Sequence, residues 1–446
     1  MKNTISLICI LLCLNDVLVA QEIHSWSLHD CVEYALEHNA SLKQEQFVND
    51  TKELGVKEKK WAFSPRVIAN SSFSASSGRV LDQTTYEYIG NSRIGAGTYS
   101  IAGTVTLFNG FRSHYELEYS KLDAKASHYR MISKENELRQ QVIEAYLLIK
   151  CNESALESAK QIRDIIGSQL RIIEQRVAFG RAVESDFLSA KAKYYEADSD
   201  VVTAEGNLEV SKNNLCYLLG IIPPIPFLIA DEEADIPTIT NLNVDLENLP
   251  EYNTAIISIS MAEKERQVAR SYYYPSLTLS FGYGSGFSTA RQLAVETVSS
   301  DIKYVPYPFV NQLRDNASLY FTLNLSIPLF NQYSTIIQSR KASLALENAR
   351  NSFLLVNQEL HQKVKQIEIE CRSLYKQHEM AIQEYRYAES TEIALREKYS
   401  QGIVDYNTWS ISLVNLAKVK YSLIETRYSY LIKAKLAQLL LNHYND

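Results

Sequence analysis

The sequence predicts a mainly α-helical protein with a small membrane-embedded β part, built from one structural unit that is used twice. Three observations indicate this fold class. Motifs recur about 220 residues apart, two segments of some 67 residues are almost free of helix breakers, and four shorter segments alternate between apolar and small polar residues. A repeat of this length means two structurally equivalent halves, so its contents predict what both halves build.

Three short motifs carry the repeat. Two of them recur 222 residues later and the third 210 residues later, so about twelve residues were added inside the second copy. The corresponding segments are 107–109 and 329–331, 178–181 and 400–403, and 63–65 and 273–275. We therefore expect a first repeat over residues 21–219 and a second over residues 250–446.

Each half contains one very long segment with few or no helix breakers. These segments predict uninterrupted helices over residues 113–179 and 334–400, each about 100 Å long at 1.5 Å per residue. Apolar residues in the second helix recur at spacings of three and four, close to a coiled-coil seam. A long soluble coiled coil is the alternative for this segment taken alone. Charged residues recur throughout it, which excludes a transmembrane helix.

Four segments alternate with a period of two, and they predict two β-hairpins, residues 65–108 and 275–329, with no further β element. Strands of about ten residues, apolar on one side and small and polar on the other, suit a membrane with lipid outside and water inside. Aromatic residues gather at the strand ends, where they favour the bilayer interface. The alternative is a half-buried sheet on a soluble protein. The residues expected to face lipid include Ile101, Val105, Leu277, Leu279, Phe281, Phe321 and Leu323.

Four strands cannot close a membrane barrel by themselves. The smallest membrane barrels have about eight strands, and an open sheet edge in lipid leaves backbone groups unpaired at several kcal/mol each. Copies of the chain must therefore pool their strands. Two copies would give a barrel too narrow to conduct much, so we expect a homotrimer with a twelve-stranded β-barrel.

Shorter helices are expected to complete a wall beside the two long helices. They cover residues 27–61 and 185–219 in the first half and residues 246–273 and 408–444 in the second. Each pair, placed end to end, matches one long helix, so stacked pairs form a helical barrel of even height. The segment 220–249 is rich in proline and acidic residues, so it is not helical throughout. We expect it to cross outside the wall near mid-height as an equatorial connector.

The start of the chain predicts export from the cytoplasm. Lys2 precedes an apolar run, and residues 18–20 suit signal-peptidase cleavage, so residues 1–20 are expected to be a signal peptide. No cysteine lies at the cleavage point, which argues against a lipoprotein. Two of the six cysteines, Cys9 and Cys13, lie in the expected signal peptide. The other four lack metal-ligand spacing and are expected to be buried free thiols, although the periplasm would permit a disulfide. They are Cys31, Cys151, Cys216 and Cys371.

Composition argues against several classes of function. The net charge is −7 and the pI is near 5.8, and there is no polybasic run, which argues against a nucleic-acid partner. The sequence shows no nucleophile–base pair, no metal cluster and no Gly-rich phosphate loop. It therefore predicts neither enzyme activity nor a cofactor.

Taken together, these residues resemble the TolC-like outer-membrane efflux proteins over essentially the whole mature chain. The similar segments are residues 26–39 (first helix), 107–111 and 328–331 (strand-to-helix junctions), and 179–180 and 401–402 (periplasmic helix–helix turns). The resemblance implies a trimeric conduit of the outer membrane, whose β-barrel continues into a long periplasmic helical barrel. It also implies outer-membrane lipid, a periplasmic adaptor protein and an inner-membrane pump of the RND or ABC type as partners.

The two glycine turns are the expected contact sites for the adaptor. Glycine at the end of a long helix adopts the left-handed conformation at little cost. Polar residues follow that can cap the returning helices, and capping alone is the alternative role. The expected caps are Glu184, Ser185 and Asp186 in the first half and Asp405, Asn407 and Thr408 in the second. The expected periplasmic tip comprises Gly180, Arg181, Glu184, Asp186, Gly402 and Asp405.

The periplasmic entrance is the expected gate. Members of the resembling family often narrow it with aspartates shortly after the second glycine turn. Here the positions six and nine residues beyond Gly402 are Thr408 and Ile411, so a ring with the usual spacing is missing. Asp405 is the nearest carboxylate, and we expect it to form a constriction with Asn407 and Thr408.

Two functions of different classes remain open. The first is a passive exit duct of a tripartite export system, driven by the inner-membrane pump. The second is a trimeric membrane-anchored stalk or adhesin without a transport role. Such stalks usually carry all their strands at one terminus, whereas here strand pairs interrupt the helices twice, which favours the duct.

Overall fold

The structure, a computed structural model, describes residues 25–81, 86, 88–222, 228–230, 244–296 and 302–441. The expected signal peptide lies outside the described residues, and so does most of the expected connector. The chain divides into two compact units. The first comprises Met1–Val48, Tyr129–Asn253 and Leu355–Asp446, and the second comprises Asn49–His128 and Thr254–Leu354.

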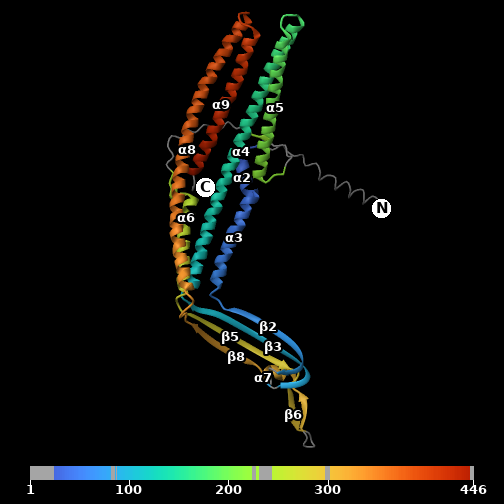
Figure 1. Cartoon of the computed structure of the whole chain (residues 1–446), viewed down its shortest axis with the longest axis vertical. Helices are drawn as coiled ribbons and strands as arrows, with labels where there is room; N and C mark the ends of the chain where they lie inside the picture. Colours follow the sequence, from blue (N-terminus) through green and yellow to red (C-terminus); the bar gives the residue numbers. More distant parts are fainter. Residues whose placement is uncertain are drawn as a thin grey trace, which may run out of the picture. The chain divides into compact units, whose positions relative to one another are not determined.

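The predicted fold class is confirmed, because the described residues are mainly α-helical with a small β part (Figure 1). The first half contains α2 (Leu28–His38), α3 (Ala40–Trp61), β2 (Arg66–Leu81), β3 (Tyr88–Asn109), α4 (Arg112–Ala178) and α5 (Glu184–Leu219). The second half contains α6 (Pro250–Ser271), β5 (Ser276–Ser288), β8 (Ser318–Ser326), α8 (Ser334–Ser400) and α9 (Tyr406–Leu441). The two long helices have 67 residues each, and the helices that follow them have 36 each. The halves therefore match element by element.

The first helix of the chain is broken in two, where the sequence predicted one helix over residues 27–61. Asn39 adopts an extended conformation between α2 and α3. Its Oδ1 accepts hydrogen bonds from the backbone N–H groups of Ser41 and Leu42, at 2.9 and 3.1 Å, and its Nδ2 donates to the carbonyl of Leu218 at 2.8 Å. The asparagine caps α3 and ties the break to the end of α5, which a periodicity argument cannot foresee. In the second half, residues 246–248 form a separate 3-10 turn before α6.

The four long strands form one antiparallel sheet in the order β2-β3-β5-β8 (Figure 1). The register aligns apolar residues of neighbouring strands, so that Val105 pairs with Leu279 and Leu279 with Leu323. One residue further along the strands, Thr104 pairs with Ser280, and Ser280 pairs with Thr322, which makes a row of small polar residues. Because side chains alternate across a strand, this register collects the apolar rows on one face and the small polar rows on the other. In the single chain, β2 and β8 are the edge strands.

The expectation of no further β element is wrong. A short hairpin of β6 (Gln292–Glu296) and β7 (Ile302–Pro306) and the helix α7 (Phe309–Asp315) stand between β5 and β8. A two-residue parallel pair, β1 (Ser25–Trp26) with β4 (Leu228–Ile229), lies elsewhere. These strands are too short to show period two in the sequence. The second copy has about twelve more residues than the first, and the segment between β5 and β8 forms a hairpin and a helix as well as loops.

Helix α7 covers the edge of β5 beyond the end of β8. The side chain of Gln312 accepts a hydrogen bond from the N–H of Ser288 at 2.8 Å and donates to the carbonyl of Tyr307 at 2.8 Å. Asn316 donates from Nδ2 to the carbonyl of Gly286 at 2.6 Å. Side-chain amides thus satisfy backbone groups that a neighbouring strand would otherwise bind.

The largest hydrophobic core among the described residues lies in the first unit and joins α2, α4 and α5 with α9. Beside it, the hydroxyl of Tyr146 on α4 lies 3.3 Å from the carbonyls of both Trp26 and Ala230, so it binds the segments of β1 and β4 to the helix. Within the part of the chain described, no helix is both long and apolar enough to cross a bilayer.

Candidate functional site

The two turns at the ends of the long helices are built alike. Gly180 and Gly402 have φ values of 67° and 72°, the left-handed region that favours glycine. Each turn is closed by two backbone hydrogen bonds, Gly180 N to Val177 O (2.9 Å) and Arg181 N to Arg176 O (2.7 Å), with the same pair 222 residues later at 3.0 and 2.9 Å. This is the Schellman arrangement, which satisfies the last carbonyls of a helix. A Cβ added at either glycine would meet no atom within 4 Å, so only the backbone conformation requires glycine there.

The residues after the two turns cap their helices differently. The predicted caps of the first half are wrong, because α5 begins at Glu184 and its N-cap is Val183, which makes no side-chain capping bond. Glu184 and Asp186 lie in the first turn of α5 instead, where acidic side chains favour the positive end of the helix dipole. In the second half, Asp405 precedes α9 and accepts hydrogen bonds from N and Oγ1 of Thr408, at 2.9 and 2.5 Å. Asp405 is therefore an N-cap residue.

The charge of Arg176, near the end of α4, also acts on the carboxylate of Asp405. The hydrogen bonds from Thr408, and to a smaller extent the charge of Arg176 near the end of α4, hold the pKa of the Asp405 carboxyl below its usual value of 3.8. Asn407 accepts a hydrogen bond from Gln169 of α4. The structure thus brings the three expected gate residues, Asp405, Asn407 and Thr408, to one end of α9, and two of them face groups of α4.

An aromatic cluster that the sequence pattern did not predict supports the second turn. Tyr399 and Trp409 stack with ring centroids 4.9 Å apart, and Tyr406 stands edge-on to both. The indole Nε1 of Trp409 donates to Oε1 of Glu392 at 3.0 Å, and Glu392 is only 6% exposed. The sequence does contain the signal, as three aromatic residues within eleven positions around a glycine turn. This cluster fixes α8 to α9 at their shared end.

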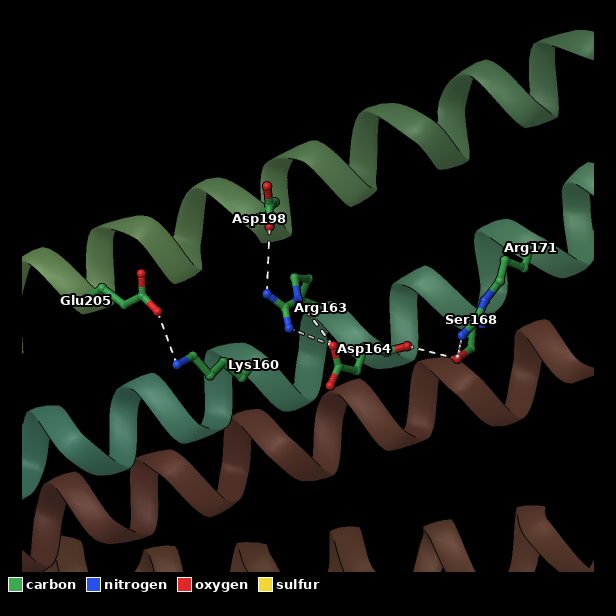
Figure 2. Close-up of polar contacts among 7 residues, drawn as sticks. All are labelled: Lys160, Arg163, Asp164, Ser168, Arg171, Asp198 and Glu205. Carbon is green, nitrogen blue, oxygen red and sulfur yellow. Dashed lines mark hydrogen bonds and ion pairs between the residues drawn. The ribbon is translucent and has the colours of Figure 1, made fainter.

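Below the first turn, α4 and α5 are joined by polar contacts (Figure 2). Lys160 pairs with Glu205 at 3.1 Å, and Arg163 reaches Asp198 of α5 at 3.9 Å while holding Asp164 at 2.9 Å. The side chains of Lys160, Glu205, Asp164 and Asp198 are about half exposed or more, and Arg163 is partly exposed; ion pairs at the surface contribute only about 0–1 kcal/mol each. These ion pairs therefore contribute little to the packing of α4 against α5.

The sheet presents the other candidate surface. Its apolar face carries large side chains that the single chain leaves open to solvent: Ile101 is 53% exposed, Phe321 68% and Leu323 61%. Val105, Leu277, Leu279 and Phe281 are half-buried on the same face. Several large apolar side chains exposed side by side on one face of a sheet indicate a place of contact with lipid or protein.

The cysteines in the described part of the chain show no ligand or redox arrangement. All four described cysteines are free thiols, and Cys31, Cys216 and Cys371 are buried. Burial raises the pKa of the Cys31 thiol to about 12, so this thiol is unreactive at neutral pH. Among the described residues, no three His, Cys, Asp or Glu side chains gather in a way that could hold a metal ion.

Comparison with known proteins agrees with this architecture. The model of the outer membrane efflux protein family matches residues 31–221 and 242–441, one match per half. The cobalt-zinc-cadmium resistance protein CzcC of Cupriavidus metallidurans is 27% identical over 193 residues, 41% of this chain and 43% of that protein. The multidrug resistance outer membrane protein MdtP of Escherichia coli K12 is 21% identical over 235 residues, 51% of this chain and 47% of that protein. The chain thus spans about half the length of these curated relatives.

Solved structures show the same fold over nearly the whole chain. The Campylobacter jejuni CmeC outer membrane channel superimposes with a TM-score of 0.76 at 15% identity, covering 94% of this chain and 87% of that one. The Vibrio cholerae outer membrane protein VceC gives a TM-score of 0.72 at 16% identity, covering 92% and 95%. The resemblance to TolC-like proteins is confirmed, and so is the expected location in the outer membrane. The chain is a member of the outer membrane efflux protein family.

Proposed function

We propose that three copies of this chain form the outer-membrane exit duct of a tripartite export system, which conducts substrates passively to the outside. The observation that carries the proposal is the four-stranded sheet with one apolar face and two edge strands, joined in one chain to two 67-residue helices. Such a sheet satisfies its backbone in lipid only when copies close it into a barrel. Three copies supply twelve strands, and the long helices continue the conduit.

In this arrangement the apolar face meets outer-membrane lipid and the small polar face lines the lumen. Rows such as Thr104–Ser280–Thr322 would surround water, while Val105–Leu279–Leu323 would contact acyl chains. The alternation agrees with the pattern of membrane strands, apolar outside and polar inside. The inner-membrane pump supplies the energy, because a barrel of this kind has no energy source of its own.

Conductance is the direct test of the duct. Protein purified in detergent and inserted into a planar bilayer should give discrete ionic conductance steps, with three chains per channel. A stalk or adhesin would insert as a trimer and conduct nothing. Trimers without conductance would therefore reject the duct and leave the anchored stalk.

The helix turns are proposed as the docking sites of the periplasmic adaptor. Exposed residues of both turns would contact it, with Gly180, Arg181, Glu184 and Asp186 in the first and Gly402 and Asp405 in the second. Because nothing lies within 4 Å of a Cβ at either glycine, a bulky side chain there would project toward a partner, while alanine imposes the same strain on the left-handed backbone without the bulk and serves as the control. Substitution of both glycines by leucine should abolish export while trimers still assemble. Normal export by this variant would reject docking at these turns.

The periplasmic entrance is proposed to be narrowed by Asp405 with Asn407 and Thr408. Support comes from their shared position at the start of α9 and from the retained negative charge of Asp405, whose pKa is lowered. A ring of three carboxylates attracts multivalent cations. Asp405→Ala should weaken block of the channel by such cations and change its single-channel conductance. Unchanged conductance and block would exclude Asp405 from the gate.

A further inference from the structure

The turns from strand to long helix have the same geometry in both halves. Each contains two consecutive residues with positive φ, 68° and 63° in the first half and 56° and 61° in the second, and these residues are Gly110, Phe111, Gln332 and Tyr333. In each turn, the preceding asparagine donates a hydrogen bond from Nδ2 to a hydroxyl four residues later. In each, two aromatic rings stand edge to face at an interplanar angle of 86°. The two turns are structurally equivalent.

Within the chain, the turn after β3 packs against the turn before β5, where the first half meets the second. A Cβ on Gly110 would lie 2.6 Å from the carbonyl of Ser271 and 2.8 Å from Cβ of Tyr274, so only glycine permits this approach. The guanidinium of Arg112 lies 4.9 Å above the ring of Tyr272. The contact leaves Ser271 only 3% exposed. We call this contact the intrachain seam.

The equivalent positions at the outer edges of the sheet lack this contact in the described part of the single chain. By the repeat offsets, Gln332 corresponds to Gly110 and Trp61 corresponds to Ser271. Gln332 is exposed, and Trp61 is 73% exposed against 3% for Ser271. The strands next to these residues, β8 and β2, are the two edge strands. A hollow of about 170 Å³ opens beside Gln332 and is lined by aromatic and apolar residues including Tyr272, Leu329, Phe330 and Tyr333.

We propose that residues 331–334 of one copy pack against residues 61–64 of the next copy, with Trp61 covering this hollow. The inference rests on the proposed closed ring and names its contact at the membrane end of the helices. In such a ring β8 of one copy pairs with β2 of the next, which repeats the pairing of β3 with β5 inside the chain. In both seams the last strand of one half meets the first strand of another half. Antiparallel pairing puts the two turns at the same end of the sheet.

The seam between copies is wider than the intrachain seam. At the intrachain spacing, the Cβ of Gln332 would meet a backbone carbonyl at about 2.6 Å, so the two turns must stand farther apart. The indole of Trp61 is larger than the serine side chain at the equivalent position 271, so it fills the additional space of the wider seam between copies. At the seam between copies, Gln332 stands where the intrachain seam has Gly110, and Trp61 stands where it has Ser271. Both sides of the seam between copies therefore carry larger side chains. The exposed edges therefore fit each other, and the occupant is a second copy of this chain.

Disulfide cross-linking tests the contact directly. Ser64 corresponds to Tyr274, whose Cβ lies 2.8 Å from the position of a Cβ at Gly110. A slightly wider spacing falls within the range of about 3.5–4.5 Å between Cβ atoms that a disulfide needs. Ser64→Cys combined with Gln332→Cys, oxidised in membranes with copper phenanthroline, should give covalent dimers and trimers on heated denaturing gels. Either single variant, and the control pair Ser64→Cys with Tyr304→Cys in the separate β6–β7 hairpin, should give none.

Two further measurements separate the possible outcomes. Unheated mild-detergent gels show whether trimers form at all. Trimers without a cross-link would overturn this contact and leave the ring intact, whereas absence of trimers for the unmodified protein would overturn the proposed function itself. Fluorescence assigned to Trp61, by subtraction of a Trp61→Phe variant, reports what covers the indole. Shielding from brominated phospholipid supports the second copy, and strong quenching would mean that lipid fills the hollow instead.

Discussion

The indole of Trp409 and the carboxylate of Glu392 join the first turn of α9 to α8, with Nε1 donating to Oε1 at 3.0 Å. Glu392 is only 6% exposed, so water has little access to Oε1 and the indole N–H of Trp409 satisfies this acceptor. Trp409→Phe keeps the stacking on Tyr399 but removes the N–H, and a buried acceptor left without its donor costs about 1–3 kcal/mol. We expect faster hydrogen exchange in the amides around the second turn. Tyr387→Phe is the control, at a position of α8 that is 72% exposed, and it should leave exchange unchanged.

A buried histidine makes the α8–α9 pair sensitive to acid. His378 on α8 is 6% exposed, and its Nδ1 lies 3.5 Å from Oγ1 of Thr426 on α9. Burial, and then the charge of Arg427, lower the pKa of His378 below its usual 6.5, while Glu379 opposes this. The unfolded chain therefore binds a proton more readily than the folded one. Stability is complete above pH 6.5 and falls as the pH drops below it.

This pH dependence can be isolated by substitution. The thermal midpoint for dissociation of the proposed trimer should be lower at pH 5.5 than at pH 7.5 in the unmodified protein. His378→Gln should remove a part of that fall, since glutamine cannot take up a proton. An identical pH profile for both proteins would show that His378 contributes nothing to it.

The cap and the charge of Asp405 can be separated. Asparagine caps a helix about as well as aspartate, whereas alanine loses about 0.5–2 kcal/mol at such a position. Asp405→Asn should therefore keep hydrogen-exchange protection at the start of α9, and Asp405→Ala should reduce it. Because the pKa of Asp405 is lowered, the charged cap contributes its stability above about pH 3.8 and loses it as the pH falls through the lower folded value. Equal loss of protection in both variants would mean that charge, and not capping geometry, stabilises this turn.

Two neighbouring residues of β5 should differ in how strongly the same substitution destabilises the protein. Leu279 lies in an apolar row with Val105 and Leu323, whereas Ser280 lies in a polar row with Thr104 and Thr322. An arginine on a lipid-facing strand position costs about 2–4 kcal/mol near the bilayer midplane. Leu279→Arg should lower the temperature at which the trimer band is lost on gels, and Ser280→Arg should be much milder. Equal defects would show that the inside–outside assignment is wrong.

Much of the fold was predictable because it depends on local signals. The absence of glycine and proline between residues 331 and 401 predicts one long helix, and α8 covers Ser334–Ser400. Gly180 and Gly402 end their helices with positive φ because the left-handed conformation is a property of glycine itself. Period-two alternation indicated the strands β2, β3, β5 and β8, since their apolar residues gather on one face over the part of each strand nearest the helices.

Other features were decided only by the tertiary structure. The break at Asn39 depends on the carbonyl of Leu218, 179 residues away, and the hairpin of β6 and β7 is too short for its pattern to be read. Glu392 reads as one more exposed charge on a helix until Trp409 is placed against it. Trp61 and Ser271 occupy equivalent positions in the repeat, yet one is exposed and the other buried. The strand after Ser271, β5, has a neighbouring strand on both sides within the chain, whereas the strand after Trp61, β2, has one on a single side. Local sequence determines which conformation a segment adopts, whereas burial and pairing depend on which distant segments fold against it.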